Sequence, residues 1–144
     1  MECRVGGIGI GLGEPFFDSA ESLIAHLLFS VPAIKGVEFG SGFRSAAMRG
    51  SEHNDCITDS KGTTLTNHAG GIVGGITNGN ELVVRAAVKP TASIAKEQMT
   101  YNFSTGTIEP LTIKGRHDAC IALRAAVVIE AAVAIALAEL KLRQ

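Results

Sequence analysis

The clearest structural signal lies in residues 72–88, IVGGITNGNELVVRAAV. Two β-prone runs flank Asn78-Gly79, the dipeptide that best tolerates the positive φ angles of a two-residue hairpin turn. Side chains alternate between the two faces of a strand, and one face of the second run carries only apolar residues: Leu82, Val84, Ala86 and Val88. We therefore predict a β-hairpin over Ile72–Val88 that buries this face.

The residues before this hairpin predict a helix and then a strand. Apolar residues recur at spacings of three and four, which is typical of one buried helix face: Leu23, Ile24, Leu27, Leu28 and Val31. Asp18 and Glu21 fit a capping box, so we predict a helix over residues 19–30 with Asp18 as its N-cap. Pro32 ends this helix, and Ile34–Phe39 follows as a short strand.

The remaining segments complete the prediction. Residues 2–13 begin as a strand and become a glycine-rich loop that matches no nucleotide-binding pattern, and residues 43–67 read as a long loop with one helical turn. A weaker hairpin joins Tyr101 and Phe103 to Ile108–Ile113. From Ala119, one long helix runs almost to the end of the chain, and its alanine-rich, apolar circumference indicates contacts on more than one side.

This order of elements predicts one domain over residues 1–144. Its fold class is α+β, with helices packed on a mainly antiparallel sheet and a long carboxyl-terminal helix.

Composition excludes several functional classes. Hydrophobic residues make up 46% of the 144 residues and charged residues 19%, which excludes a disordered chain. A net charge of −1 gives the chain no overall positive electrostatic potential that would attract nucleic acid. The charged residues Arg124, Glu130 and Glu139 argue against a membrane span in the long helix. Three widely spaced cysteines without a C-x-x-C pair favour no metal site. Together with the lack of a signal peptide, they predict a cytoplasmic protein.

Two polar clusters precede or begin the predicted hairpin. In residues 48–55, Glu52, His53 and Asp55 could ligate a metal, but their spacing matches no known metal site and favours a solvated loop with local hydrogen bonds. In residues 66–75, His68 precedes two Gly-Gly pairs. Backbone amides exposed by glycines can line an anionic or planar ligand, while a structural histidine is an equally good interpretation.

Two further clusters carry cations. The run Lys89-Pro90-Thr91-Ala92-Ser93 ends a strand with one ammonium and two hydroxyls, which fits a phosphate site or an ordinary turn. Residues 114–118 place two cations, an imidazole and Asp118 just before the long helix. Carboxylates are favoured at helix N-termini, so local reasoning favours Asp118 as an N-cap.

Six motifs follow one another along the chain: Gly11-Leu12-Gly13-Glu14-Pro15 with Phe17-Asp18, Arg49-Gly50-Ser51, Asn67-His68-Ala69-Gly70-Gly71-Ile72, Gly74-Gly75-Ile76, Lys89-Pro90-Thr91 and Gly115-Arg116-His117-Asp118. Taken in this order, they resemble the carboxyl-terminal part of chorismate synthase over nearly the whole chain. The resemblance implies part of that family's β-α-β sandwich. It also implies a lyase of the shikimate pathway of aromatic amino acid biosynthesis, which converts 5-enolpyruvylshikimate 3-phosphate to chorismate by 1,4-elimination of phosphate and requires reduced FMN.

The resemblance also implies roles for particular residues. The flavin-binding positions of the family correspond to Ala33, Gly74, Lys89, Pro90, Thr91, Ala92, Ser93 and Arg116. Arg116 is further implied to contact the substrate, and Asp118 to be the catalytic acid that moves the released proton. Ala119 stands where family members commonly have proline, so we expect a straighter entry into the last helix.

The family's amino-terminal motifs, including Gly-Glu-Ser-His-Gly and two catalytic histidines, do not occur in this sequence. We therefore expect a fragment, a split-gene product or a truncated chain that is inactive alone and acts with a separate amino-terminal half. The resemblance further implies a homo-oligomer, since the family is usually tetrameric. The alternative is a non-catalytic flavin-binding or assembly module derived from the family.

Overall fold

The computed structural model describes residues 1–143 and is built on a three-stranded antiparallel sheet. β5 (Leu82–Val88) is the central strand, with β1 (Glu2–Val5) on one side and β2 (Ile34–Phe39) on the other. Cys3 lies opposite Val84 in one pair and Phe39 lies opposite Val84 in the other. β5 therefore pairs with one segment about 80 residues earlier in the sequence and with another about 45 residues earlier.

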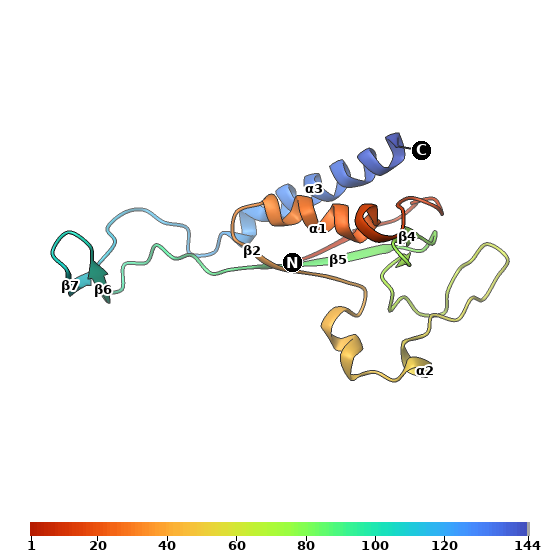
Figure 1. Ribbon diagram of the computed structural model, residues 1–144, viewed down its shortest axis with the longest axis horizontal. Coiled ribbons are helices and arrows are strands. Elements are labelled where there is room, and N and C mark those ends of the chain that lie inside the picture. Colours follow the sequence, from red (N-terminus) through yellow and green to blue (C-terminus); the bar gives the residue numbers. More distant parts are fainter. Residues whose placement is uncertain (144) are drawn as a thin grey trace.

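Two helices cover one face of this sheet (Figure 1). α1 (Ala20–Ser30) and α3 (Ala122–Leu142) pack against each other, and α1 also contacts β2. The core between the layers consists of residues from both helices and from the strands, among them Ile24, Leu28, Leu82, Val84, Ala86, Ile129, Val133 and Ala136. The predicted buried face of the second β-prone run is thus confirmed, as is the α+β class with antiparallel strands and a long carboxyl-terminal helix.

The opposite face of the sheet carries a row of ion pairs. Arg85 Nε lies 2.7 Å from Glu38 Oε1, and Arg85 Nη1 lies 3.2 Å from Glu2 Oε2. Arg4 pairs with the same Glu2 carboxylate at 2.7 Å. The backbone N–H of Phe43 and the Arg85 guanidinium together hold the pKa of Glu38 below its usual value. This row links all three strands across the face that the helices leave uncovered.

The predicted first helix is confirmed, but its N-cap is displaced by one residue. Ser19, not Asp18, is the N-cap, because its Oγ accepts a hydrogen bond from the backbone N–H of Ser22 at 3.0 Å. Asp18 instead belongs to a short 3-10 helix, Phe16–Asp18, and its side chain pairs with Arg143 at 3.2 Å. Serine and aspartate are comparable caps, so the local sequence could not choose between these neighbours.

The predicted hairpin over Ile72–Val88 is wrong. β3 (Ile72–Val73) pairs with β4 (Ile76–Thr77) through a turn at Gly74-Gly75, both of which have positive φ angles of 61° and 84°. The second β-prone run, β5, leaves this small hairpin and joins the central sheet. The burial and hydrogen bonding that β5 gains between β1 and β2 outweigh the local preference of Asn78-Gly79 for a hairpin turn.

The long segment between β2 and β3 is largely loop, as predicted. It contains a 3-10 helix, Gly42–Ala47, and a single-turn helix, α2 (Gly50–His53). The amino-terminal residues also behave as expected: after β1 the chain forms a glycine-rich loop, in which Gly11 N–H donates to Thr77 O at 2.9 Å.

The second predicted hairpin is confirmed as an arm that extends from the core (Figure 1). β6 (Gln98–Asn102) pairs with β7 (Thr107–Leu111). Its large apolar side chains are exposed: Met99, Tyr101, Phe103, Ile108 and Leu111. An isolated two-stranded hairpin is at best marginally stable, so this arm is suited to packing against another surface.

The long helix begins three residues later than predicted, at Ala122, and runs to Leu142; Gln144 lies outside the described residues. No helix among residues 1–143 is long and apolar enough to cross a membrane.

Candidate functional site

Two of the predicted flavin-binding positions meet at one end of the sheet. The backbone N–H of Lys89, just after β5, donates to the carbonyl oxygen of Ala33 at 2.8 Å. Ala33 joins α1 to β2 and has a φ of 74°, a conformation that L-residues other than asparagine and aspartate rarely adopt. Ala33 and Lys89 are 56 residues apart in the sequence. Their two loops meet because the neighbouring residues Ile34 and Val88 pair in the sheet.

The run after β5 places one hydroxyl in an unusual environment. Lys89, Pro90 and Ala92 are exposed, whereas Thr91 and Ser93 are half-buried. The Oγ1 atom of Thr91 is buried without a hydrogen-bond partner among the described residues. A buried hydroxyl without a partner costs free energy, so this atom fits a site where a ligand oxygen completes the hydrogen bond.

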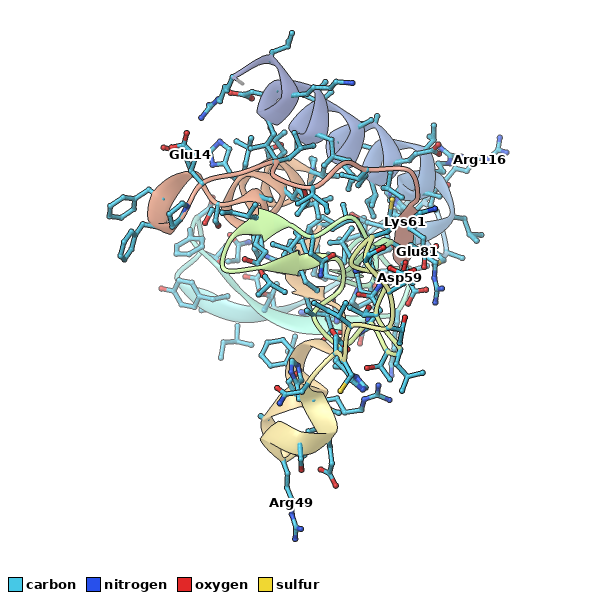
Figure 2. The ribbon with its side chains drawn as sticks, turned by 90° about the vertical axis from the view of Figure 1, so that its right-hand side faces the viewer. Glu14, Arg49, Asp59, Lys61, Glu81 and Arg116 are labelled. Carbon is cyan, nitrogen blue, oxygen red and sulfur yellow. The ribbon has the colours of Figure 1, made fainter. Side chains whose placement is uncertain are left out.

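Arg116 and Asp118 lie on the segment that returns from the β6–β7 arm to α3. Arg116 is exposed and, beside the start of α3, points away from the body of the molecule (Figure 2). Asp118 Oδ1 pairs with Arg124 Nη2 at 3.0 Å. The capping interpretation of Asp118 is wrong, because α3 starts at Ala122 and its N-cap is Ile121, which makes no side-chain cap. The helix begins too far along the chain for Asp118 to reach its first amides.

Gly74 is separated from the other predicted flavin-binding positions. It forms the turn between β3 and β4, and β4 lies at the end of β5 away from the β6–β7 arm (Figure 1). An added Cβ at Gly74 would meet no atom within 4 Å, so its backbone faces open space. Within the described residues, the predicted flavin positions therefore fall into three places: Ala33 with residues 89–93, Gly74 by itself, and Arg116 on the segment before α3.

A large cavity lies on the side of Gly74. Its volume is about 990 Å³. Most of its walls come from β2, the loop before β3 and β3 itself, and Ile10, Glu21 of α1 and Asn78 complete them. It unites the predicted clusters of residues 48–55 and 66–75. The rings of His53 and His68 lie with their centroids 5.6 Å apart.

Asp55 holds the loop that carries His68. Its Oδ1 accepts hydrogen bonds from Thr66 Oγ1 at 2.7 Å and from the backbone N–H of His68 at 2.8 Å, and its Oδ2 accepts from the N–H of Ala69 at 2.9 Å. Partial burial raises the pKa of this carboxyl, but the Ala69, Thr66 and His68 donors and the charge of His68 together bring the pKa below its usual value. Asp55 is therefore a structural anion.

The two histidines are each held by a serine. His68 Nδ1 lies 2.8 Å from Ser41 Oγ, and His53 Nε2 lies 3.0 Å from Ser45 Oγ. Neither serine was predicted, because Ser41 and Ser45 are 27 and 8 residues from their histidines and no sequence motif joins either pair. Among residues 1–143 no three His, Cys, Asp or Glu side chains come together in a way that could hold a metal ion. The favoured interpretation of residues 48–55 as a solvated loop with local hydrogen bonds holds only in part. Arg49 and Glu52 do bond locally, but Gly50–His53 is the helical turn α2, and Asp55 bonds to residues 11–14 positions further along the chain.

The comparisons with known proteins identify the family. A family model described as chorismate synthase matches residues 1–142. The chain belongs to the chorismate synthase family. Its six motifs are thus those of a family member, as the resemblance in the sequence implied.

Individual chorismate synthases match nearly the whole chain. The protein of Chitinophaga pinensis is 64% identical over 142 residues, which cover 99% of this chain and 43% of that protein. The protein of Archaeoglobus fulgidus is 48% identical over 146 residues, which cover all of this chain and 41% of that protein. A crystal structure of chorismate synthase matches with a TM-score of 0.76 at 33% identity, over 99% of this chain and 36% of that one. The chain thus spans about two fifths of the curated relatives it matches.

Proposed function

We propose that this chain contributes a flavin-binding part of a chorismate synthase. The reaction converts 5-enolpyruvylshikimate 3-phosphate to chorismate and inorganic phosphate by 1,4-elimination, in the cytoplasm. The observation that carries the proposal is the Oγ1 atom of Thr91, which is buried without a hydrogen-bond partner among residues 1–143. It lies two residues after Lys89, whose backbone joins the two loops through the hydrogen bond to Ala33. A phosphate-bearing ligand such as FMN satisfies the Thr91 hydroxyl and the Lys89 cation at once.

Each residue in this group has a separate physical role. Lys89 supplies an exposed point charge for the phosphate, and Thr91 supplies a hydroxyl donor. Pro90 fixes its own φ between them and so limits the freedom of the run. The unusual φ of Ala33 directs its carbonyl to Lys89 and holds the two loops in register. These residues bind and orient the flavin.

The residues around Ala33 and Lys89 would hold reduced FMN, which would lend electron density to the allylic system as phosphate leaves and recover it as the ring proton leaves, with no net redox change. Arg116 offers a planar fork of donors to a phosphate or carboxylate of the substrate. We assign the proton released from the ring to Asp118 Oδ2, since Oδ1 is engaged by Arg124 at 3.0 Å. The ion pair fixes the orientation of the carboxylate for this transfer.

The relatives, all named chorismate synthase, favour this proposal over a non-catalytic module. Because they are more than twice as long, we propose that activity requires further chain, with the assembled enzyme a homo-oligomer. The exposed apolar residues of the β6–β7 arm support self-association, because such surface is normally covered.

The test is an anaerobic titration of reduced FMN into the chain, followed by flavin fluorescence. Thr91→Val keeps the shape and removes the hydroxyl, and Lys89→Ala removes the charge. Hydrogen bonds to charged groups contribute about 1.5–3 kcal/mol, so each variant should weaken binding by roughly tenfold or more. Lys61→Ala, an exposed lysine on another loop, is the matched control and should bind as the wild type does. Equal affinity in all four proteins would refute the assignment.

A further inference from the structure

Two histidines line the large cavity beside the loop before β3, and each is held by a serine. His68 Nδ1 lies 2.8 Å from Ser41 Oγ, and His53 Nε2 lies 3.0 Å from Ser45 Oγ. The other ring nitrogens, Nε2 of His68 and Nδ1 of His53, make no hydrogen bond with residues 1–143. Both histidines are half-buried, so these two nitrogens are available to a ligand in the cavity.

The hydrogen-bond network assigns a proton to each of the two free nitrogens. Arg44 Nη2 donates to Ser41 Oγ at 3.5 Å, so the hydroxyl hydrogen of Ser41 is available to His68 Nδ1. Within residues 1–143, His53 Nε2 is the partner to which the Ser45 hydroxyl can donate. Each serine therefore donates to its histidine, and the neutral rings carry their N–H groups at Nε2 of His68 and Nδ1 of His53.

The other walls of the cavity are apolar or acidic. Ile10, Ile57 and Val73 are apolar, yet each is at least 60% exposed. Exposed apolar surface around a concave site is typical of ligand binding, and a volume of about 990 Å³ accommodates a bicyclic aromatic group. Among residues 1–143, the charged side chains that line the cavity besides the histidines are Glu21 and Asp55. Their carboxyl groups disfavour a ligand with several negative charges.

The two imidazole rings are close enough to interact once they are protonated. Their centroids lie 5.6 Å apart and their planes are inclined at 31°. Two positive charges at this separation repel each other, so the free protein resists protonation of both rings. A carboxylate in contact with both rings offsets this repulsion, because it brings one negative charge and two oxygens that accept one N–H each. A carboxylate with an apolar body therefore matches both the histidine pair and the apolar walls.

The charged groups on the sheet side of His68 are engaged with one another. The two guanidinium groups of the ion-pair row are bonded to three carboxylates: Arg4 and Arg85 pair with Glu2, Glu38 and Glu81. Nearer to the ring are Asp55, whose charge interacts with His68, and Arg44, which reaches Ser41. Asp55 and Arg44 carry opposite charges, so they act on the protonation of His68 in opposite directions.

The charged groups on the cavity side supply no cation for an anion. The side chain of Arg49 points away from the molecule at the start of α2 (Figure 2), and its backbone N–H donates to the Glu52 carboxylate at 2.8 Å. On the loop before β3, Asp59 Oδ1 accepts a hydrogen bond from the N–H of Lys61 at 2.8 Å. Burial raises the pKa of Glu21, so this carboxyl is more readily neutral than an exposed one. Among residues 1–143, the cavity walls thus contain the histidine pair as their cationic group.

We propose that this cavity binds a small monocarboxylate with an apolar or aromatic body, which His53 and His68 hold through their free ring N–H groups. The apolar walls cover the body of the ligand. One imidazole takes up a proton from solvent as the anion binds, so the affinity rises as the pH falls. The proposal goes beyond the reaction of the family and does not depend on the flavin site.

The test titrates 2-naphthoate into the full chain at about pH 5.5 and about pH 8, on either side of the ordinary histidine pKa, without flavin. Binding should move the ring-proton NMR signals of His53 and His68 and leave those of His26 and His117 in place. The affinity should be at least about tenfold higher at the lower pH, because the bound state holds the extra proton. At that pH, neutral 2-naphthamide has nearly the same shape without the charge and should bind at least about tenfold more weakly.

Two variants assign the binding to the pair. Glutamine keeps an N–H donor but cannot take up a proton, so His53→Gln and His68→Gln should each weaken binding of 2-naphthoate at about pH 5.5 by roughly tenfold and flatten its pH dependence. His26→Gln changes an exposed histidine on α1 and is the matched control, which should bind as the wild type does. Circular dichroism and urea denaturation establish that each variant is folded.

Four outcomes overturn the proposal. The first is a titration at the lower pH in which the signals of His53 and His68 do not move. The second is 2-naphthamide that binds as tightly as 2-naphthoate, and the third is an affinity that is equal at both pH values. The fourth is displacement of 2-naphthoate by 5-enolpyruvylshikimate 3-phosphate, since the cavity would then belong to the substrate site. All four are measured on the wild type, so a variant that fails to fold leaves the decision intact, and none depends on FMN binding.

Discussion

Replacing Asp55 by asparagine tests how the cavity wall is held. The carboxylate accepts three hydrogen bonds with its two oxygens, from Thr66 and His68 on Oδ1 and from Ala69 on Oδ2. An asparagine has the same shape but only one acceptor oxygen. If the asparagine oxygen keeps the two hydrogen bonds that Oδ1 accepts, the asparagine NH₂ group takes the place of Oδ2. This NH₂ group then faces the N–H of Ala69, and two donors cannot form a hydrogen bond with each other.

The magnitude follows from these contacts. Hydrogen bonds to a charged group contribute about 1.5–3 kcal/mol, and one such bond is lost while the other two lose their charge assistance. We expect Asp55→Asn to lower the free energy of unfolding by about 2 kcal/mol at pH 7. For a chain of this size, that loss lowers the Tm by roughly 6 °C.

The effect should depend on pH with a defined sign. The pKa of the Asp55 carboxyl is below its ordinary value of 3.8, so the ionised group stabilises the folded protein at pH values above 3.8. This stabilisation is lost as the pH falls through the lower pKa of the folded state. The difference between wild type and Asp55→Asn should therefore be full at pH 7 and shrink below about pH 4.

Urea denaturation at pH 7 and at pH 3 measures both quantities, and amide exchange at Ala69 reports on local opening of the loop. Asp18→Asn is the control, since the Asp18–Arg143 pair is on the surface and should contribute less than about 1 kcal/mol. A variant at Asp55 that unfolds within about 0.5 kcal/mol of wild type at pH 7, with unchanged exchange at Ala69, would contradict this account of the loop.

Two further predictions concern the fold around the sites. Gly40→Ala should destabilise the protein by roughly 2–5 kcal/mol in urea denaturation, because φ is 54° and the new Cβ would lie 2.0 Å from His68 O; Gly50→Ala, where the Cβ meets nothing within 4 Å, should change stability little. Leu28→Ala should cost about 2–5 kcal/mol, since Leu28 is fully buried between α1 and the sheet and the change leaves a cavity. If Gly40→Ala or Leu28→Ala lowered the free energy of unfolding by less than about 1 kcal/mol, the residues around that position would relax more than the packing described here allows.

The local sequence pattern was sufficient to predict a helix or strand wherever a single element buries one of its own faces. The three- and four-residue spacing from Leu23 to Val31 predicted α1, and the alternation from Leu82 to Val88 predicted the buried face of β5. Both patterns are properties of a single segment, because a helix or strand can bury only the residues that its own period brings to one side.

The local sequence pattern did not predict which strands pair with one another. Asn78-Gly79 predicted that β5 would turn back on the preceding run, but β5 pairs with β1 and β2. β5 pairs with four residues of β1 and five residues of β2. These long-range pairs, with the burial that accompanies them, outweigh a turn preference that involves two residues. The same limit applies to the N-cap of α1, where Ser19 and Asp18 are equivalent until packing fixes the start of the helix.

The sequence by itself determined the family, the helix and strand types, and the residues predicted to hold a phosphate, since each is written in a short contiguous motif. Only the tertiary structure decided which of these residues meet: Lys89 contacts Ala33, Asp55 holds the loop of His68, and Gly74 lies at the far end of the sheet. Such proximity depends on which distant segments share hydrogen bonds and apolar surface, and a one-dimensional pattern does not contain that information.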